Sequence, residues 1–157
     1  MPQTPADAPF TPLTKDTVAS AFSYLRAVQA GDAQAAAKLV TAEPQMSAFL
    51  AGIAEGIVVA GTALPGPDDD APTWDSFTLE TLGNVFLSAL RIWQQAGPDA
   101  AQGIAQTIID FVTAILCEEH DDIADALNTY ESCARGQLLL DARAASTAAY
   151  PVGNTAA

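Results

Sequence analysis

Residues 46–64 of the chain are MSAFLAGIAEGIVVAGTAL. Glu55 is the only charged residue in this segment, and apolar or small residues would occupy every side of the helix that its composition predicts. A helix that is apolar all round either lies in a protein core or spans a membrane. We expect burial, because helices predicted elsewhere in the chain are amphipathic and no basic residues closely flank the segment. The sequence therefore predicts an all-α fold, a single-domain bundle of five or six helices around a buried, glycine-containing third helix.

Small residues recur every four positions along this third helix, at Ala48, Gly52, Gly56 and Ala60. Glycine in a helix interior lowers helix stability relative to alanine, so its repeated use predicts that another helix crosses this stripe closely. Membrane helices use the same spacing to pack against each other, and the segment approaches the length that crosses a bilayer. A membrane-inserted third helix is therefore the alternative to the buried one, and we expect no membrane association.

Two helices are predicted before this segment. Thr14 can cap the first helix, whose apolar residues recur at helical spacing until Gly31 ends it. Asp32 can cap a second, short and alanine-rich helix that runs to about Ala42. We expect these two helices to form a helical hairpin.

Three helices are predicted after a proline-rich acidic loop at residues 65–73. Asp75 can cap the fourth helix, and Gly97-Pro98 supplies both its end and the start of the fifth. The apolar spacing of the fifth helix is interrupted near His120, where we expect a break before the sixth helix begins.

The two ends of the chain, residues 1–13 and 148–157, are predicted to be disordered tails around a helical domain of residues 14–147. Prolines at positions 2, 5, 9 and 12 lack backbone donors and disfavour helix, and the last residues are small and polar. The first residues have neither the basic start nor the apolar run of a secretory signal, so we expect a cytoplasmic protein.

The net charge of −13 results from a shortage of bases, because six Lys and Arg residues stand against 19 Asp and Glu residues. Nucleic-acid binding needs clustered Lys and Arg side chains that neutralise phosphates, and the bases of this chain are scattered singly. We therefore expect no nucleic-acid partner.

The segment from Glu118 to Asp125 is the one cluster of catalytic or metal-ligating residue types in the sequence. A carboxylate and imidazole site needs its ligands on one helix face, and His120 has no carboxylate three residues before it. Calcium needs six to eight oxygen ligands, and the residues here do not follow the spacing of a calcium loop. We interpret the cluster as a solvated helix start and predict no metal and no cofactor. A metal-dependent enzyme that uses residues 118–125 is the least favoured alternative.

Other catalytic signatures are missing from the sequence. It contains no nucleophile elbow and no phosphate-binding glycine loop, and its single histidine limits any triad to one base. Cys117 and Cys133 are separated by 16 residues, a spacing that does not favour a disulfide, and we expect both to be buried as small apolar side chains. These observations favour a protein that is not an enzyme.

The fourth and fifth helices carry more apolar residues than one buried face needs. Leu87, Ile92 and Ile109 fall outside the main apolar stripes and must bury a second face or form a surface patch. We therefore expect a non-enzymatic acidic helical protein-interaction module that self-associates as a homo-oligomer, such as a homodimer, or binds a protein partner. The alternative is a helical bundle that binds a small apolar ligand in a cavity lined by its aromatic residues, namely Phe86, Trp93, Phe111 and Tyr130.

Overall fold

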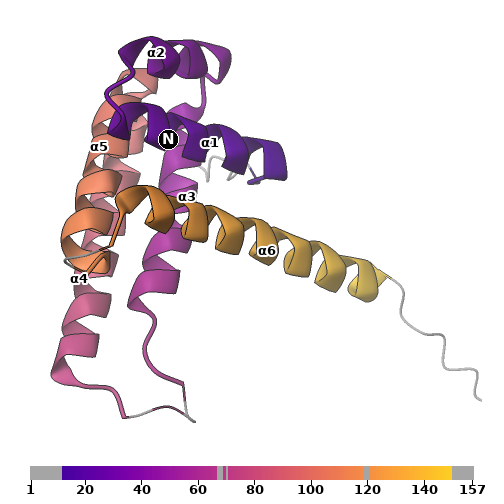
Figure 1. Cartoon of the computed structure of the whole chain (residues 1–157). Helices are drawn as coiled ribbons and strands as arrows, with labels where there is room; N and C mark the ends of the chain where they lie inside the picture. Colours follow the sequence, from indigo (N-terminus) through magenta and orange to yellow (C-terminus); the bar gives the residue numbers. More distant parts are fainter. Residues whose placement is uncertain (1–11, 67–68, 70, 119–120, 150–157) are drawn as a thin grey trace, which may run out of the picture.

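The computed structural model describes residues 12–66, 69, 71–118 and 121–149, and these residues form an all-α bundle without strands (Figure 1). The α-helices are α1 (Lys15–Gln29), α2 (Ala33–Ala42), α3 (Met46–Thr62), α4 (Trp74–Trp93), α5 (Ala101–Phe111) and α6 (Ile123–Ala149). Two 3-10 segments, η1 (Gln94–Ala96) and η2 (Pro98–Ala100), join α4 to α5, and a π-helical segment, η3 (Val112–Leu116), extends α5. The predicted fold class is confirmed.

The starts of the first two helices agree with the capping residues expected from the sequence. The Thr14 hydroxyl accepts a hydrogen bond from the backbone N–H of Thr17, and the Thr17 hydroxyl accepts one from the backbone N–H of Thr14. The Asp32 carboxylate accepts a hydrogen bond from the backbone N–H of Ala35 at 2.9 Å and caps α2. Each cap satisfies a backbone donor that the helix leaves without an internal partner.

The start of α4 differs from the expectation. Thr73 caps this helix in a reciprocal arrangement with Ser76, and Asp75 lies in the first turn instead of at the cap. A carboxylate in the first turn still interacts favourably with the positive end of the helix dipole. The chain therefore uses Asp75 for charge and Thr73 for hydrogen bonding.

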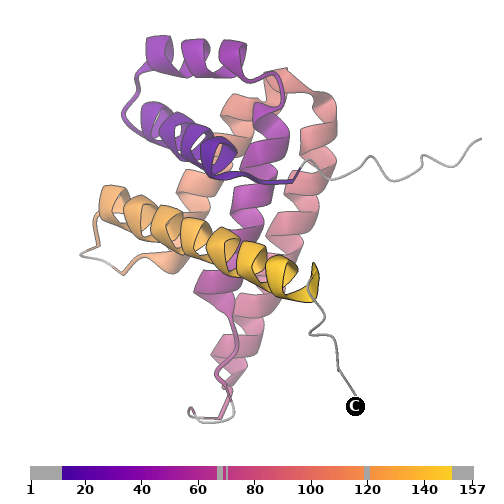
Figure 2. The same cartoon turned by 90° about the vertical axis from the view of Figure 1, so that its right-hand side faces the viewer.

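Helix α3 lies at the centre of the bundle and contacts α1, α4, α5 and α6. Helices α3, α4 and α5 run along the long axis of the molecule, α1 and α6 cross them, and α2 lies at one end (Figures 1 and 2). The largest fully buried side chains come from α1, α3, α4, α5 and α6, and they include Phe22, Leu50, Leu90, Ile104 and Leu127. The expectation of a buried third helix is correct for the side of α3 that carries Leu50, Ile53 and Ile57.

The predicted close-packing stripe needs a correction. Ala48, Gly56 and Ala60 are exposed, and a Cβ atom added at Gly56 would meet no atom within 4 Å. Gly52 is covered by the side chain of Leu13, a residue expected in the disordered tail, and not by a crossing helix. The apolar residues of α3 bury the opposite side, so the stripe faces outward within the described part of the chain.

The close approach of two helices occurs instead at Gly83 of α4. A Cβ atom at this position would lie 2.6 Å from Cγ1 of Val58 and 3.1 Å from Oγ1 of Thr62, both on α3. Glycine permits this contact because it has no Cβ atom. The contact fixes which side of α4 faces the core.

No single helix in the described residues is long and apolar enough to cross a membrane. Helices α2 and α3 together would meet the length and composition, but the chain bends by 103° between them.

Candidate functional site

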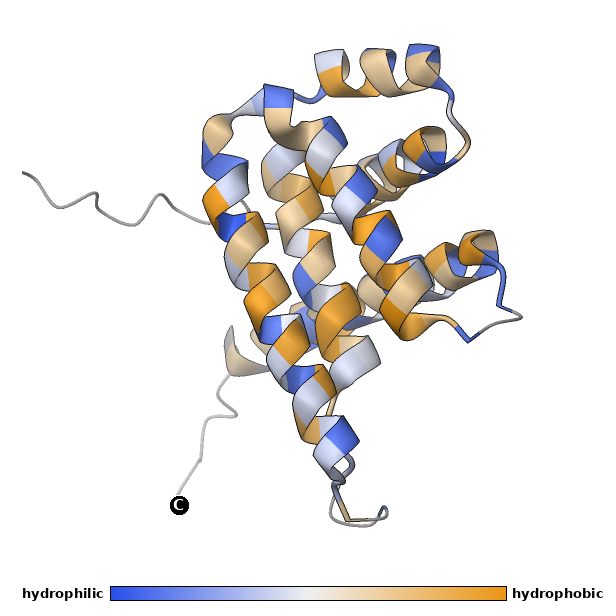
Figure 3. Cartoon of the chain, turned by 90° about the vertical axis from the view of Figure 1, so that its left-hand side faces the viewer, coloured by the Kyte–Doolittle hydropathy of each residue, from blue (hydrophilic) through white to orange (hydrophobic). Residues whose placement is uncertain are grey.

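The outer face of α4 carries exposed apolar side chains along the whole helix. Trp74 is 87% exposed, Val85 62% and Ile92 72%. Eighteen residues make five turns of an α-helix, so Trp74 and Ile92 lie on one line along the helix, with Val85 close to it. Figure 3, which colours the ribbon by hydropathy, shows apolar residues along the length of α4 and not only at its ends. We call this line, together with Thr78 and Thr81, the α4 outer face.

A shallow groove of about 410 Å³ lies at the N-terminal half of this face. Its walls are apolar apart from two threonine hydroxyls, and both hydroxyls donate hydrogen bonds to carbonyl oxygens one turn earlier in the helix. The groove therefore offers apolar surface and almost no free hydrogen-bonding capacity. Its lining residues are Trp74, Phe77, Thr78, Thr81, Leu82 and Val85.

The charged residues of α4 lie away from its outer face. Asp75, Glu80 and Arg91 are separated from the line through Trp74 and Ile92 by about a quarter turn or more, given about 100° per residue. Arg91 forms a half-exposed ion pair with Glu55 of α3, with 3.5 Å between nitrogen and oxygen. A contiguous exposed helix face without charge is a candidate site of interaction.

Of the three residues predicted to form an interface, only Ile92 is exposed. Leu87 is 6% exposed and Ile109 7%, so both belong to the core, and their assignment to an interface is wrong. Ile92 is the predicted interface residue that remains accessible. Trp74 and Val85 were missed, although the 18-residue spacing from Trp74 to Ile92 was a signal that could have found the first of them.

The aromatic residues predicted to line one ligand cavity occupy separate packing contacts. The rings of Phe86 and Phe111 stack with their centroids 4.2 Å apart, and Phe111 is buried. The ring of Trp93 covers Gly103, where an added Cβ atom would lie 2.8 Å from the indole. Tyr130 packs against the core beside Gly61. These contacts are separate from one another, and a common cavity lined by all four side chains stays a prediction.

In the described part of the acidic segment before α6, two carboxylates accept hydrogen bonds from backbone N–H groups. The Asp121 carboxylate accepts a hydrogen bond from the Glu118 N–H, and the Asp122 carboxylate accepts one from the Ala124 N–H. Asp125 lies in the first turn of α6. Residues 119–120, including His120, lie outside the described residues, and among those described no group of three or more His, Cys, Asp or Glu side chains could hold a metal ion.

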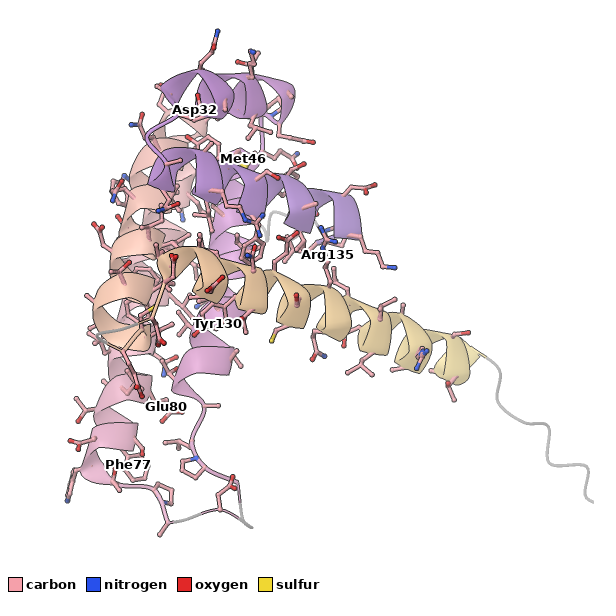
Figure 4. The ribbon with its side chains drawn as sticks, viewed as in Figure 1. Asp32, Met46, Phe77, Glu80, Tyr130 and Arg135 are labelled. Atoms are coloured by element: carbon pink, nitrogen blue, oxygen red, sulfur yellow. The ribbon has the colours of Figure 1, made fainter. Side chains whose placement is uncertain are left out.

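A polar network joins α1 to α6. Arg26 of α1 donates hydrogen bonds to Asn128, at 2.8 Å, and to Glu131, and Arg135 donates one to the other oxygen of Glu131 at 2.5 Å. Figure 4 shows Arg135 on the side of α6 that faces α1. These hydrogen bonds connect the two helices, which favours a structural role for the network.

Comparisons with known proteins do not add a relative. A scan against protein-family models, a search of curated proteins and a search of solved structures each found no match. The function is therefore argued from the geometry alone.

Proposed function

We propose that the protein is a non-enzymatic interaction module that associates with a second copy of itself through the α4 outer face. The observation that carries the proposal is the uncharged line of Trp74, Val85 and Ile92, which stays exposed while Gly83, Leu87 and Leu90 of the same helix are buried. Burial of apolar surface is the main driving force of association, and a face of this kind gains by being covered.

The residues of this face suit antiparallel pairing of two α4 helices. If the two-fold axis passes beside residue 83, Trp74 lies opposite Ile92 of the second copy, and Thr81 lies opposite its Val85. Asp75 and Arg91 lie on opposite sides of this face, so the pairing leaves both charges at its rims and buries neither. Antiparallel helices also align their dipoles favourably.

The expected affinity between the two copies follows from the size of the α4 outer face. The line from Trp74 to Ile92 is roughly 27 Å long at 1.5 Å per residue. One helix from each copy buries less than the roughly 1,600 Å² of a standard stable interface. We therefore expect dissociation in the micromolar range and exchange between monomer and dimer.

Sedimentation velocity over micromolar concentrations tests the proposal. The wild-type chain should show a concentration-dependent shift towards a dimer, and Val85→Asp should remain a monomer because the new carboxylate would be buried in the interface. Asn84→Asp is the matched control, because it adds the same charge to the neighbouring exposed residue away from the line. Circular dichroism should show the same helix content in all three proteins. A wild-type chain that stays monomeric at every concentration would overturn self-association.

A further inference from the structure

A second surface feature is a half-open pocket of about 300 Å³, which the C-terminal end of α1, all of α2 and the start of α5 enclose. No residue of α4 lines this pocket, so ligand binding there would not depend on self-association through α4. Figure 4 shows Asp32 at the junction between α1 and α2, beside the pocket. The side chains that line it include Tyr24, Ala27, Ala36, Val40, Gln102 and Gln106.

The pocket exists because α2 is built from small residues. Alanine occupies half of this helix, and none of its residues is fully buried. Leu39 and Val40 supply most of the apolar contact with the core, while the alanines leave the space between α2 and α5 unfilled. Protein interiors are close-packed, so an unfilled space of this size between α1, α2 and α5 is a candidate binding site.

Tyr24 is the one tyrosine among the residues that line the pocket. The side chain is 3% exposed, yet its hydroxyl makes no hydrogen bond with any described residue. No buried side-chain oxygen or nitrogen among the described residues lacks both a partner and access to solvent. The Tyr24 hydroxyl therefore keeps some access to solvent, and the Tyr24 side chain lines the pocket. A buried tyrosine hydroxyl normally has a partner, so a free one in a pocket is available to a ligand.

The charges around the pocket limit what it can bind. No Lys or Arg lines it, and its one carboxylate, from Asp32, is already engaged as the cap of α2. The chain carries a net charge of −13, which disfavours an anion here. Gln102 and Gln106 supply neutral amides at the rim, and the Gln106 amide nitrogen donates to Asp110. Burial raises the pKa of the Tyr24 phenol, so the group is a neutral donor at physiological pH.

We propose that this pocket binds a small uncharged molecule with an apolar body and one carbonyl or ether oxygen, which accepts a hydrogen bond from the Tyr24 hydroxyl. Ala27, Ala36 and Val40 contact the apolar body, and the glutamine amides bound the open side. The site differs from the aromatic cavity considered from the sequence, because it is lined mainly by alanine and valine and contains a single tyrosine.

Cyclohexanone is a suitable probe, since it combines an apolar ring with one acceptor, and cyclohexanecarboxylate is its anionic counterpart. In nitrogen-15 correlation spectra, cyclohexanone should cause saturable shifts of backbone amide signals in α2 and at Gln102 and Gln106. Tyr24→Phe should weaken its binding about fivefold, the effect of one lost hydrogen bond. Ala36→Leu should fill the pocket and remove the shifts. Tyr130→Phe is the matched control and should bind like the wild type.

Three results would overturn the proposal. The first is the absence of saturable shifts at these positions in the wild-type protein. The second is an affinity for cyclohexanone that Tyr24→Phe leaves unchanged or that Tyr130→Phe weakens equally. The third is tighter binding of cyclohexanecarboxylate than of cyclohexanone. The Ala36→Leu variant keeps the test decisive if Tyr24→Phe is poorly folded, because it leaves the tyrosine in place.

Discussion

At the scale of single residues, the glycines of α3 and α4 differ in what surrounds them. A Cβ atom at Gly83 would lie 2.6 Å from a methyl group of Val58, whereas one at Gly56 would meet nothing within 4 Å. Valine is stiff about its one side-chain torsion, so the contact at Gly83 is not relieved by a simple rotation. The two glycines therefore have different roles, although both lie in helix interiors.

Alanine substitutions should separate these roles. Gly83→Ala should lower the free energy of unfolding by about 1 to 3 kcal/mol, because the extra methyl group overpacks the contact with α3. Gly56→Ala should raise it by about 0.5 to 1 kcal/mol, because alanine is the better residue in an exposed helix interior. Chemical denaturation followed by circular dichroism measures both changes. A destabilised Gly56→Ala protein would show that a neighbour covers this position after all.

The two cysteines should differ in reactivity, contrary to the expectation that both are buried. Cys133 is exposed, whereas Cys117 is partly covered. Burial, together with the nearby Asp121 carboxylate, raises the pKa of the Cys117 thiol, so less of the reactive thiolate is present at a given pH. Iodoacetamide should therefore modify Cys133 first, and modification of Cys117 should accelerate as the pH rises. Peptide mapping by mass spectrometry over time measures both rates, and equal rates would contradict the argument.

At the scale of the helices, Glu131 is the residue through which α1 and α6 are connected by charge. Its side chain is 13% exposed, and both of its oxygens accept hydrogen bonds from arginines. Its partners are more exposed, Arg26 at 35% and Arg135 at 50%, so solvent weakens each pair. The shared carboxylate holds both guanidinium groups at one place on the helix interface.

Removing this carboxylate should cost more than removing its outer partner. Glu131→Ala should lower the free energy of unfolding by about 1 kcal/mol, because Arg26 and Arg135 lose their common acceptor. Arg135→Ala should cost no more than about 0.5 kcal/mol, the usual value for an exposed pair within one helix. A double-mutant cycle between Arg26 and Glu131 isolates the link between α1 and α6. If the two single variants lose equal stability, the network does not have its centre at Glu131.

The helices also show how much of the fold could be predicted from the sequence. Helix starts at Thr14 and Asp32 were predictable because capping depends on a few neighbouring residues. The rotation of α4 was not, because apolar residues occur on most sides of this helix and the contact at Gly83 decides which side faces α3. Leu87 was therefore assigned to the surface, while Trp74 escaped notice at the start of the helix. The surroundings of the Tyr24 hydroxyl are formed by three helices, α1, α2 and α5, so no local sequence pattern could predict that this hydroxyl has no partner.

At the scale of the whole molecule, the net charge of −13 acts against the self-association proposed for α4. Each copy repels the other at long range, and this repulsion decreases as salt shortens the screening length to about 8 Å at physiological ionic strength. Asp75 and Arg91 lie at opposite rims of the face and form no pair across the interface, so the repulsion between the two copies should dominate the electrostatics.

Self-association should therefore become stronger as sodium chloride is added, in contrast to complexes held by charge attraction. The apolar contacts of Trp74, Val85 and Ile92 are not weakened by moderate salt, whereas the repulsion between acidic surfaces is screened. Sedimentation velocity at fixed protein concentration and increasing salt measures the fraction of dimer, and Val85→Asp should stay monomeric throughout. Asp75→Asn should also favour the dimer at low salt, because it lowers the net negative charge of each copy. A dimer fraction that falls with salt would mean that attraction between charges holds the copies together, and the α4 outer face would lose its role as the main contact.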